Sequence, residues 1–218
     1  DPLAANPKAT VQTIVRGLPG SRVTLSDGNV VGDAAHPLKA FVFDKTGKLY
    51  VNAGAPSDNC LPARATKPCA AGEGAAPLAA IWAFTPPQGG IFPALKPDDP
   101  NPPREIFARG LRNSMALAMH PDFPVAGFAF LQAENSRDLP DIFQPNEEIN
   151  ALEKGKHYGW PYCYDLKTVS PEFKSFLRTV SPYKNLCGNA ALYRAPLSLR
   201  LPHAATLGML YYLGEKFP

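Results

Sequence analysis

Short apolar runs separated by polar turns dominate this 218-residue chain. Helical periodicity is nearly absent, and residues 171–180 are the best short helix candidate. Strand patterns instead recur in a fixed order. They predict strands over residues 39–43, 48–53, 79–85 and 104–109, and then over 115–119, 128–133, 148–152 and 197–201. The order restarts at residues 207–213, where a further strand is expected.

This repeat predicts an all-β fold built from blade-like units of four strands. The units span about residues 36–111 and 112–202, and residues 203–218 begin the next one. Four-stranded units repeated around an axis form β-propellers, so a partial β-propeller is predicted, with a β-sandwich with long loops as the alternative. Because a propeller closes with at least four blades, the chain is expected to be a fragment or one piece of a larger protein.

Composition narrows the function classes. The chain holds 25 prolines, which indicates short strands joined by long, fixed loops. Its net charge is only +3 and its basic residues are scattered, so nucleic-acid binding is not expected. No apolar stretch approaches the ~20 residues that a membrane span needs.

The four cysteines fall into two local pairs, Cys60 with Cys69 and Cys163 with Cys187, and neither has zinc-site spacing. Two disulfides are the favoured interpretation, and free structural thiols are the alternative. Disulfides would place the protein in the periplasm or outside the cell. Asp1 is neither an initiator Met nor the start of a signal peptide, so a processed or cut end is expected.

An aromatic segment stands out, with aromatic side chains at every second position: Tyr158, Trp160, Tyr162 and Tyr164. On an extended backbone these side chains would share one face. Gly159 and Pro161 disfavour an ordinary internal strand. The pattern predicts an irregular but ordered segment that fills a core or floors a ligand pocket, with the core favoured.

Polar residues precede the leading strand of each unit, namely His36, Arg112 with Asn113, and His203. A histidine at such a position can act as a base near neutral pH, although a loop histidine bonded to backbone is the alternative. Arg112 and Asn113 suit an oxygen-rich anionic ligand, or else are a surface arginine and a turn residue. The loop 134–138 offers oxygen ligands suitable for calcium.

Several enzyme classes find no support. The chain contains no Gly-x-Ser-x-Gly, no P-loop and no Gly-x-Gly-x-x-Gly. Serine hydrolase, nucleotide hydrolase and Rossmann-type functions are therefore not indicated.

Taken in order, these elements resemble the soluble quinoprotein sugar dehydrogenases. The resemblance rests on His36, on FVFDKTGKLYVNAG at 41–54, GLRN at 110–113, EEIN at 147–150, YGWP at 158–161 and PHAA at 202–205. It covers about residues 30–218. The PHAA element and the cysteine pairs look closest to the sorbosone and pyranose dehydrogenase branch.

The resemblance implies a six-bladed β-propeller that binds pyrroloquinoline quinone (PQQ) with calcium, oxidises an aldose or sugar aldehyde, and passes electrons to an external cytochrome or quinone. His36 matches the family's catalytic base. Arg112 and Asn113 match the pair at the quinone carbonyl, and Asn135 matches a cofactor-contacting amide. The carbonyls of Ser136 and Arg137 match the calcium ligands, and His203 matches a polar residue on the cofactor side.

Some positions depart from the family pattern. The carboxylate that supports the histidine would fall at Ala55, so either Asp58 takes that role or the support is lost. Ser136 and Arg137 replace Gly and Pro. The residues that bind the quinone carboxylates would lie beyond Pro218, so this chain alone is expected to bind PQQ poorly or not at all. A non-catalytic propeller module and a calcium-dependent propeller lactonase are the alternatives.

Overall fold

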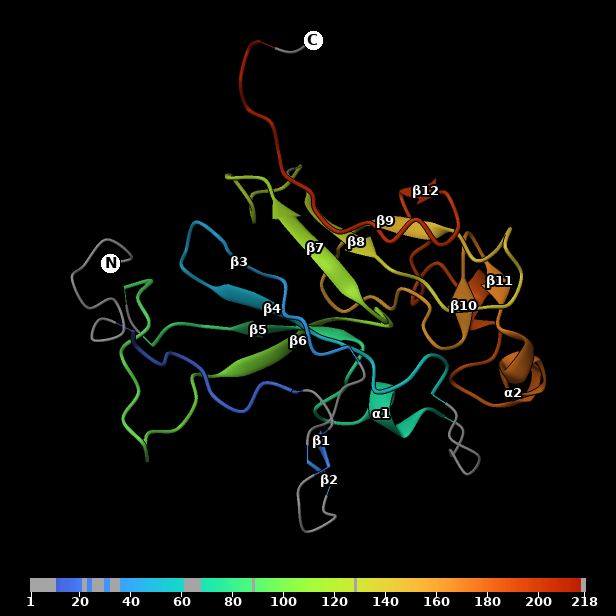
Figure 1. Ribbon diagram of the computed structural model, residues 1–218, viewed down its shortest axis with the longest axis horizontal. Helices are drawn as coiled ribbons and strands as arrows, with labels where there is room; N and C mark the ends of the chain where they lie inside the picture. The colour runs from blue at the N-terminus through green and yellow to red at the C-terminus, as the bar shows by residue number, and fades with distance from the viewer. Residues whose placement is uncertain are drawn as a thin grey trace.

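The computed structural model describes residues 11–20, 23–24, 30–31, 36–60, 68–87, 89–127 and 129–216. Two antiparallel four-stranded sheets form its centre (Figure 1). One has the order β3-β4-β5-β6 and the other β7-β8-β9-β12. Their bounds are β3 (Phe41–Phe43), β4 (Leu49–Ala53), β5 (Ala80–Phe84), β6 (Arg104–Arg109), β7 (Ser114–Met119), β8 (Phe130–Glu134), β9 (Glu147–Ala151) and β12 (Ser198–Arg200). In both sheets each strand pairs with its neighbour in sequence, except that β9 reaches β12 across an insertion.

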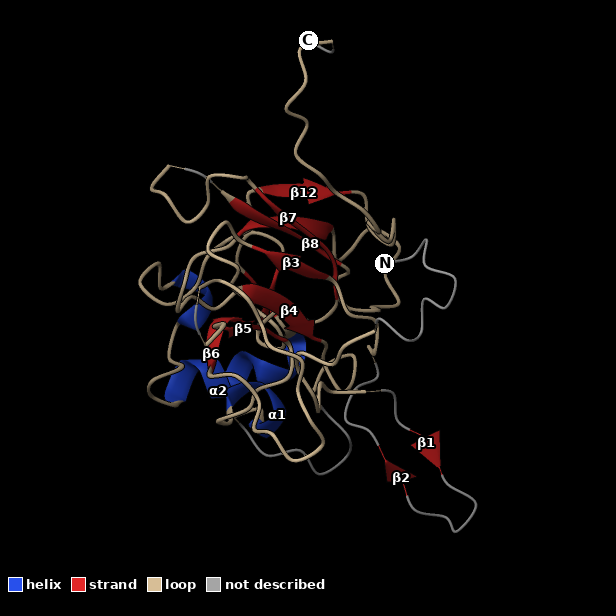
Figure 2. Cartoon of the chain, turned by 90° about the vertical axis from the view of Figure 1, so that its left-hand side faces the viewer, coloured by secondary structure: helices blue, strands red, loops and turns tan. Residues whose placement is uncertain are grey.

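Smaller elements surround the sheets. Two short antiparallel pairs join β1 (Val23–Thr24) to β2 (Val30–Val31) and β10 (Cys163–Tyr164) to β11 (Thr168–Val169). The helical elements are α1 (Ala70–Glu73), η2 (Pro171–Phe173), α2 (Lys174–Thr179) and η3 (Leu186–Gly188). Figure 2 shows α1 and α2 gathered at one end of the molecule, away from β12. No helix in the described part of the chain is long and apolar enough to cross a membrane.

The alternation of side chains explains the strands. In β7, buried and half-buried positions alternate, as expected for a strand with one covered face. Every position of β4 and β5 is buried, because these strands lie inside their sheet and are covered on both faces. The turn before β4 is closed by the Asp44 carboxylate, which accepts hydrogen bonds from the backbone nitrogens of Thr46 and Lys48.

The eight strands predicted for the two units are confirmed, with ends that differ by at most two residues. Residue 128, where one of them was expected to begin, lies outside the described residues. The helix predicted over 171–180 is confirmed as η2 and α2. Both predicted disulfides are present, Cys60–Cys69 and Cys163–Cys187.

The strand predicted over residues 207–213 is wrong. These residues are extended but pair with no other strand in the described part of the chain. Met209 packs against the cluster of Ala116, Ala133 and Ile149, but Leu207, Leu210 and Leu213 are exposed, so most of the apolar pattern that suggested a strand is not covered. A strand needs partners for its backbone groups as well as an apolar pattern, and here only the pattern is present.

The aromatic segment belongs to the core, as predicted, but its side chains do not share one face. All four aromatics are buried. Tyr158 packs in the cluster with Tyr50, Phe107 and other sheet residues, whereas Trp160 and Tyr162 pack against the two disulfides. The chain turns at Gly159, whose φ of 119° belongs to glycine and where a Cβ would lie 2.6 Å from the carbonyl oxygen of Cys163.

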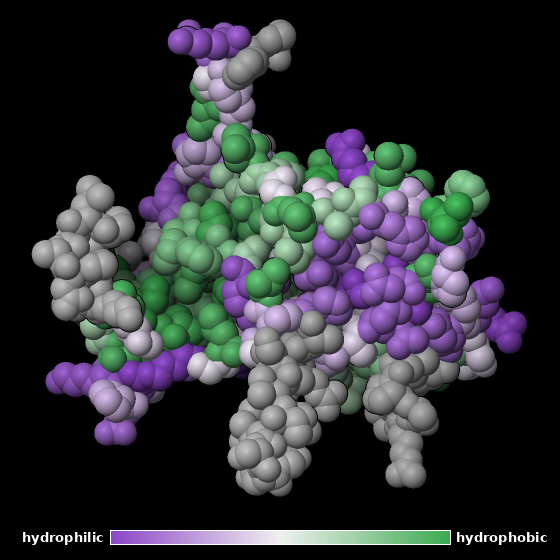
Figure 3. Space-filling model, in the orientation of Figure 1, coloured by the Kyte–Doolittle hydropathy of each residue, from purple (hydrophilic) through white to green (hydrophobic). Residues whose placement is uncertain are grey.

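The surface is unevenly apolar. Figure 3 shows apolar residues gathered over β3 and the neighbouring part of β7. Phe41 and Phe43, on the edge strand β3, are 63% and 44% exposed. The face of the first sheet at β3 is therefore only partly covered.

Candidate functional site

The loops that carry the predicted site residues meet where the two sheets adjoin. The side-chain amide of Asn52 donates to the carbonyls of Leu38 and Ser114, both at 3.1 Å, and so ties the start of β3 to the start of β7. The backbone nitrogen of Ala55, after β4, donates to the carbonyl of Arg112 at 2.7 Å. These bonds bring loops from both units together.

Three predicted site residues line one pocket. His36, Asn113 and Asn135 surround a pocket of about 240 Å³ with Pro37, Leu38 and Met115. The backbone nitrogen of Asn135 donates to the carbonyl of Asn113 at 3.0 Å, which fixes the two residues beside each other. We call this pocket, defined by His36, Asn113 and Asn135, the histidine pocket.

His36 is held by backbone rather than by a carboxylate. Its Nδ1 lies 2.8 Å from the carbonyl oxygen of Ala55. Because a carbonyl only accepts, Nδ1 carries the proton and Nε2 keeps its lone pair. The close approach depends on Gly54, since a Cβ there would collide with the carbonyl oxygen of His36.

The charge state of His36 follows from its surroundings. Burial lowers the pKa of His36, and the positive charge of Arg112 lowers it further. The bond to Ala55 and the charges of Asp138 and Asp58 oppose this shift without reversing it. His36 is therefore neutral at neutral pH, with a basic nitrogen available.

Arg112 is buried and engaged within the protein. Its guanidinium lies 2.5 Å from the Asp138 carboxylate and 3.1 Å from that of Asp58. It also donates to the carbonyls of Asn135 and Ser136, at 3.2 and 2.6 Å. Arg112 therefore lies behind the histidine pocket and shapes the loop that follows β8.

Arg137 extends this network toward the insertion. It is buried, and its guanidinium pairs with Glu172 of η2 at 2.8 Å and with Asp58 at 3.4 Å. The pairing with Arg137 lowers the pKa of Glu172 to about 2. Of the two alternatives for the support of His36, the structure favours its loss, because Asp58 joins Arg112 to Arg137 instead.

The loop after β8 is held by hydrogen bonds, but two of its buried side-chain atoms, Oδ1 of Asn135 and Nε of Arg137, have no hydrogen-bond partner among the described residues. Among the described residues, the side-chain oxygen of Asn135 is buried and accepts no hydrogen bond. The backbone nitrogen of Ser136 donates to Glu147 at 2.6 Å. An unpartnered buried acceptor beside an open pocket is a feature that a bound ligand would satisfy.

His203 lies outside the histidine pocket. It is exposed, and its Nε2 lies 3.1 Å from the carbonyl oxygen of Asp141. Its segment nevertheless reaches the loop after β8, because the Glu147 carboxylate accepts from the backbone nitrogens of both Ala205 and Ser136.

Two carboxyl groups are buried beneath this loop. Glu134, expected within the loop 134–138, is instead the last residue of β8, and Glu148 was not expected at the site. Glu134 of β8 and Glu148 of β9 face each other directly across the sheet. Burial raises the pKa of Glu134 to about 8. Burial, and then the charge of Glu134, raise the pKa of Glu148 well above its ordinary value. The sequence did offer a signal for this pair, because Glu148 stands in a predicted strand and Glu134 directly follows one, where the sheet is expected to bury side chains.

Comparison with known proteins finds a curated relative and several similar solved structures, each matched over only part of its length. No family model matches the chain. An uncharacterized protein of Synechocystis sp. is 28% identical over 131 residues, which are 59% of this chain and 27% of that protein.

Three solved structures align with most of the chain. They are a glucose dehydrogenase (20% identity, TM-score 0.50, 89% of this chain and 52% of that one), the soluble aldose sugar dehydrogenase of Escherichia coli in its apo form (22%, 0.50, 89% and 50%), and an oxidoreductase of Thermus thermophilus described as a glucose dehydrogenase (18%, 0.50, 88% and 55%). At these identities the similarity shows a shared fold. The chain spans about half the length of these structures and about a quarter of its curated relative.

Proposed function

We propose that this chain is part of a PQQ-dependent sugar dehydrogenase with a six-bladed β-propeller. The observation that carries the proposal is the histidine pocket, where a neutral histidine with an available Nε2 stands beside two amides. The folds shared with glucose and aldose sugar dehydrogenases agree with it.

The residues of the pocket fit a flat, oxygen-rich cofactor. The unpartnered side-chain oxygen of Asn135 and the amide of Asn113 offer both acceptor and donor groups at the pocket wall. The chemistry that PQQ would supply when bound is acceptance of a hydride from the sugar carbon. Arg112, fixed behind the pocket, contributes positive charge near the side where negative charge would develop.

His36 would act as the general base. Its Nε2 accepts the proton of the sugar hydroxyl while the hydride leaves the same carbon, so that the hydroxyl becomes a carbonyl. The bond from Nδ1 to Ala55 holds the ring in the tautomer that this step needs. No carboxylate is required to fix that tautomer.

Calcium would lie at the loop after β8, held by the carbonyls of Ser136 and Arg137. Around this loop the three carboxylates of Asp58, Asp138 and Glu172 outnumber the two guanidinium groups of Arg112 and Arg137, so the net charge of these side chains is negative, which favours a cation. The carbonyl of Ser136 already accepts from Arg112, so it would ligate through its second lone pair. His203, on the segment next to this loop, would contribute a polar side chain on the cofactor side rather than a calcium ligand.

The class of sugar and the cellular compartment are inferred from sequence motifs and from the disulfides. The PHAA element and the cysteine pairs favour a substrate of the sorbosone or pyranose type and an external cytochrome or quinone as electron acceptor. Two disulfides favour an oxidising compartment, so we place the protein in the periplasm or outside the cell.

The direct test reconstitutes the full-length protein with PQQ and calcium and follows dye reduction with a panel of aldoses and sugar aldehydes. The variant His36→Ala should lower kcat/KM by about 10²–10⁴-fold, the usual contribution of a positioned base. His120→Ala, at the turn after β7 and outside the pocket, is the matched control. Full activity of His36→Ala would remove the proposed base. Lactone hydrolysis without any electron acceptor would indicate a lactonase. If the protein bound neither PQQ nor calcium, a non-catalytic module would be indicated.

A further inference from the structure

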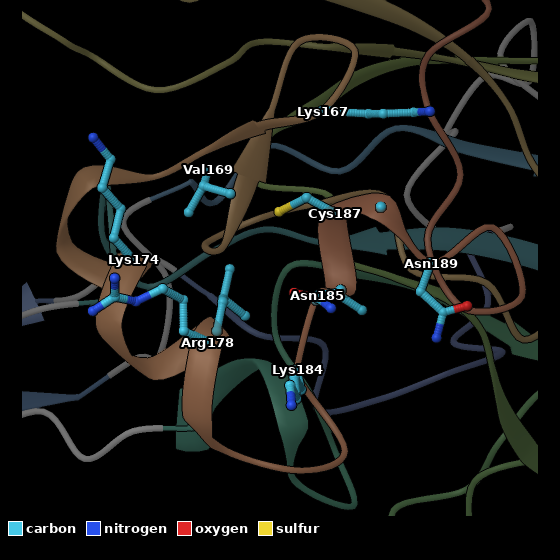
Figure 4. A pocket seen from close by; sticks show the side chains of 11 residues that line it. Lys167, Val169, Lys174, Arg178, Lys184, Asn185, Cys187 and Asn189 are labelled. Atoms are coloured by element: carbon cyan, nitrogen blue, oxygen red, sulfur yellow. The ribbon is translucent and has the colours of Figure 1, made fainter.

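The insertion between β9 and β12 contains a second pocket, separate from the histidine pocket. Its volume is about 930 Å³, within the range of about 300–1,000 Å³ typical of small-molecule sites. Its walls come from three pieces of the insertion: β11, helix α2 and the turn around η3 (Figure 4).

Positive charge dominates the lining. Lys167, Lys174, Arg178 and Lys184 all border the pocket, and no carboxylate does among the residues that the structure describes. Figure 4 shows Lys174 and Arg178 on α2 with their charged ends directed outward on one side, and Lys167 directed to the opposite side, toward Asn189, so the cations stand around the rim. Within the described part of the chain, none of these four side chains takes part in an ion pair.

The acidic residues of the insertion interact with residues outside the pocket. The Asp165 carboxylate accepts from the backbone nitrogen of Asn146 at 2.8 Å. The Glu172 carboxylate pairs with Arg137 at 2.8 Å. The Glu153 carboxylate pairs with Arg194 at 2.8 Å. None of these three acids lines the pocket, so its four positive charges are not compensated from within the insertion.

Beneath the charges the pocket has an apolar, firmly held floor. Val169, Leu177 and Leu186 line it, and both leucines are buried. The Cys163–Cys187 disulfide ties η3 to β10, and the backbone nitrogen of Asn185 donates to the carbonyl of Leu177 at 2.9 Å. The walls are thus fixed before any ligand arrives, which lowers the entropic cost of binding.

We propose that this pocket binds a small anion that carries two or more carboxylate or phosphate groups. Several separated cations around one cavity match several negative charges on one molecule. The hollow shape and apolar floor suit a small molecule, whereas an acidic protein would dock on a flatter, more polar face. This site does not depend on the function proposed for the histidine pocket.

The test is isothermal titration calorimetry on the purified protein with citrate and with pyrophosphate, at constant ionic strength. We expect one site per chain for at least one of the two probes, and the stronger one identifies the preferred anionic group. The triple variant Lys174→Ala, Arg178→Ala, Lys184→Ala should weaken binding by about tenfold or more.

The matched control removes the same number of charges elsewhere, through Lys45→Ala, Lys96→Ala and Lys216→Ala, and should keep the original affinity. Circular dichroism and thermal unfolding of each variant verify that the fold is intact. Equal weakening in both triple variants, or no binding of either probe at millimolar concentration, would overturn the proposal. So would binding of poly-glutamate without binding of citrate or pyrophosphate, because that result would indicate a protein-docking surface.

Discussion

At the scale of single residues, the backbone partner of His36 has a consequence for pH dependence. A carboxylate partner would stabilise the protonated imidazole, whereas the Ala55 carbonyl carries no net charge. Burial and Arg112 therefore keep the pKa of His36 below its ordinary value of 6.5. A histidine with a lowered pKa remains unprotonated in mild acid and can still accept a proton.

We accordingly predict that kcat/KM for sugar oxidation falls on the acid side with an apparent pKa below 6.5. Protonated His36 cannot accept a proton, so activity is present above that pKa and is lost as the pH falls through it. The measurement is a profile of kcat/KM from about pH 4.5 to about pH 8 for the reconstituted full-length enzyme. An acid limb above pH 6.5 would contradict the assigned surroundings of His36.

Asp58 provides a second prediction at this scale, because it joins two buried guanidinium groups. Asp58→Ala leaves Arg112 and Arg137 each with one carboxylate fewer, and should lower the free energy of unfolding by about 2 kcal/mol. Asp138→Ala is the matched control: its side chain is 77% exposed, so its loss should cost less than about 1 kcal/mol. Urea unfolding measures the free energy of unfolding of both variants. Equal losses would show that Asp58 does not stabilise the two guanidinium groups more than Asp138 does.

At the scale of elements, the two disulfides stabilise loops of different length. Cys163–Cys187 closes a separation of 24 residues and Cys60–Cys69 one of 9. Loop-closure entropy predicts losses of about 3.5 and about 2.7 kcal/mol when each pair is replaced by alanines. Chemical unfolding of Cys163→Ala/Cys187→Ala and Cys60→Ala/Cys69→Ala tests the order. A larger loss for the shorter loop would mean that packing around Trp160 outweighs chain entropy.

Elements with a local signal could be predicted from the sequence. The strands of the two sheets were found because short apolar runs alternate with polar turns in a repeated order, and the disulfides because the cysteines fall into local pairs. The segment 207–213 has the same apolar pattern, but a strand also requires a partner that no local pattern reveals.

The site could be predicted only in part, for a similar reason. His36, Asn113 and Asn135 were expected together, and they line one pocket. The pairing of Arg112 with Asp58 joins distant parts of the chain, so the sequence could not tell that its guanidinium faces inward. The contact between Glu134 and Glu148 depends on the register of β8 and β9, which alternation alone does not fix.

At the scale of the whole molecule, that buried carboxyl pair should govern stability against pH. Both groups hold protons in the folded state, since their pKa values are raised, and both release them in the unfolded chain near pH 4.5. The stabilising contribution is therefore fully present below about pH 4.5. It is lost as the pH rises through the folded pKa of about 8 for Glu134.

We predict that Glu148→Gln flattens this dependence. The amide keeps the shape of the side chain but cannot ionise, so it ends the repulsion with Glu134 at high pH. The variant should be more stable than the wild type by about 1–2 kcal/mol at about pH 9 and within about 0.5 kcal/mol of it at about pH 5. Glu153→Gln, an exposed glutamate paired with Arg194, should leave the shape of the curve unchanged. Urea unfolding across this pH range provides the comparison, and a wild-type curve that stays flat throughout it would refute the raised pKa values and with them the coupling across β8 and β9.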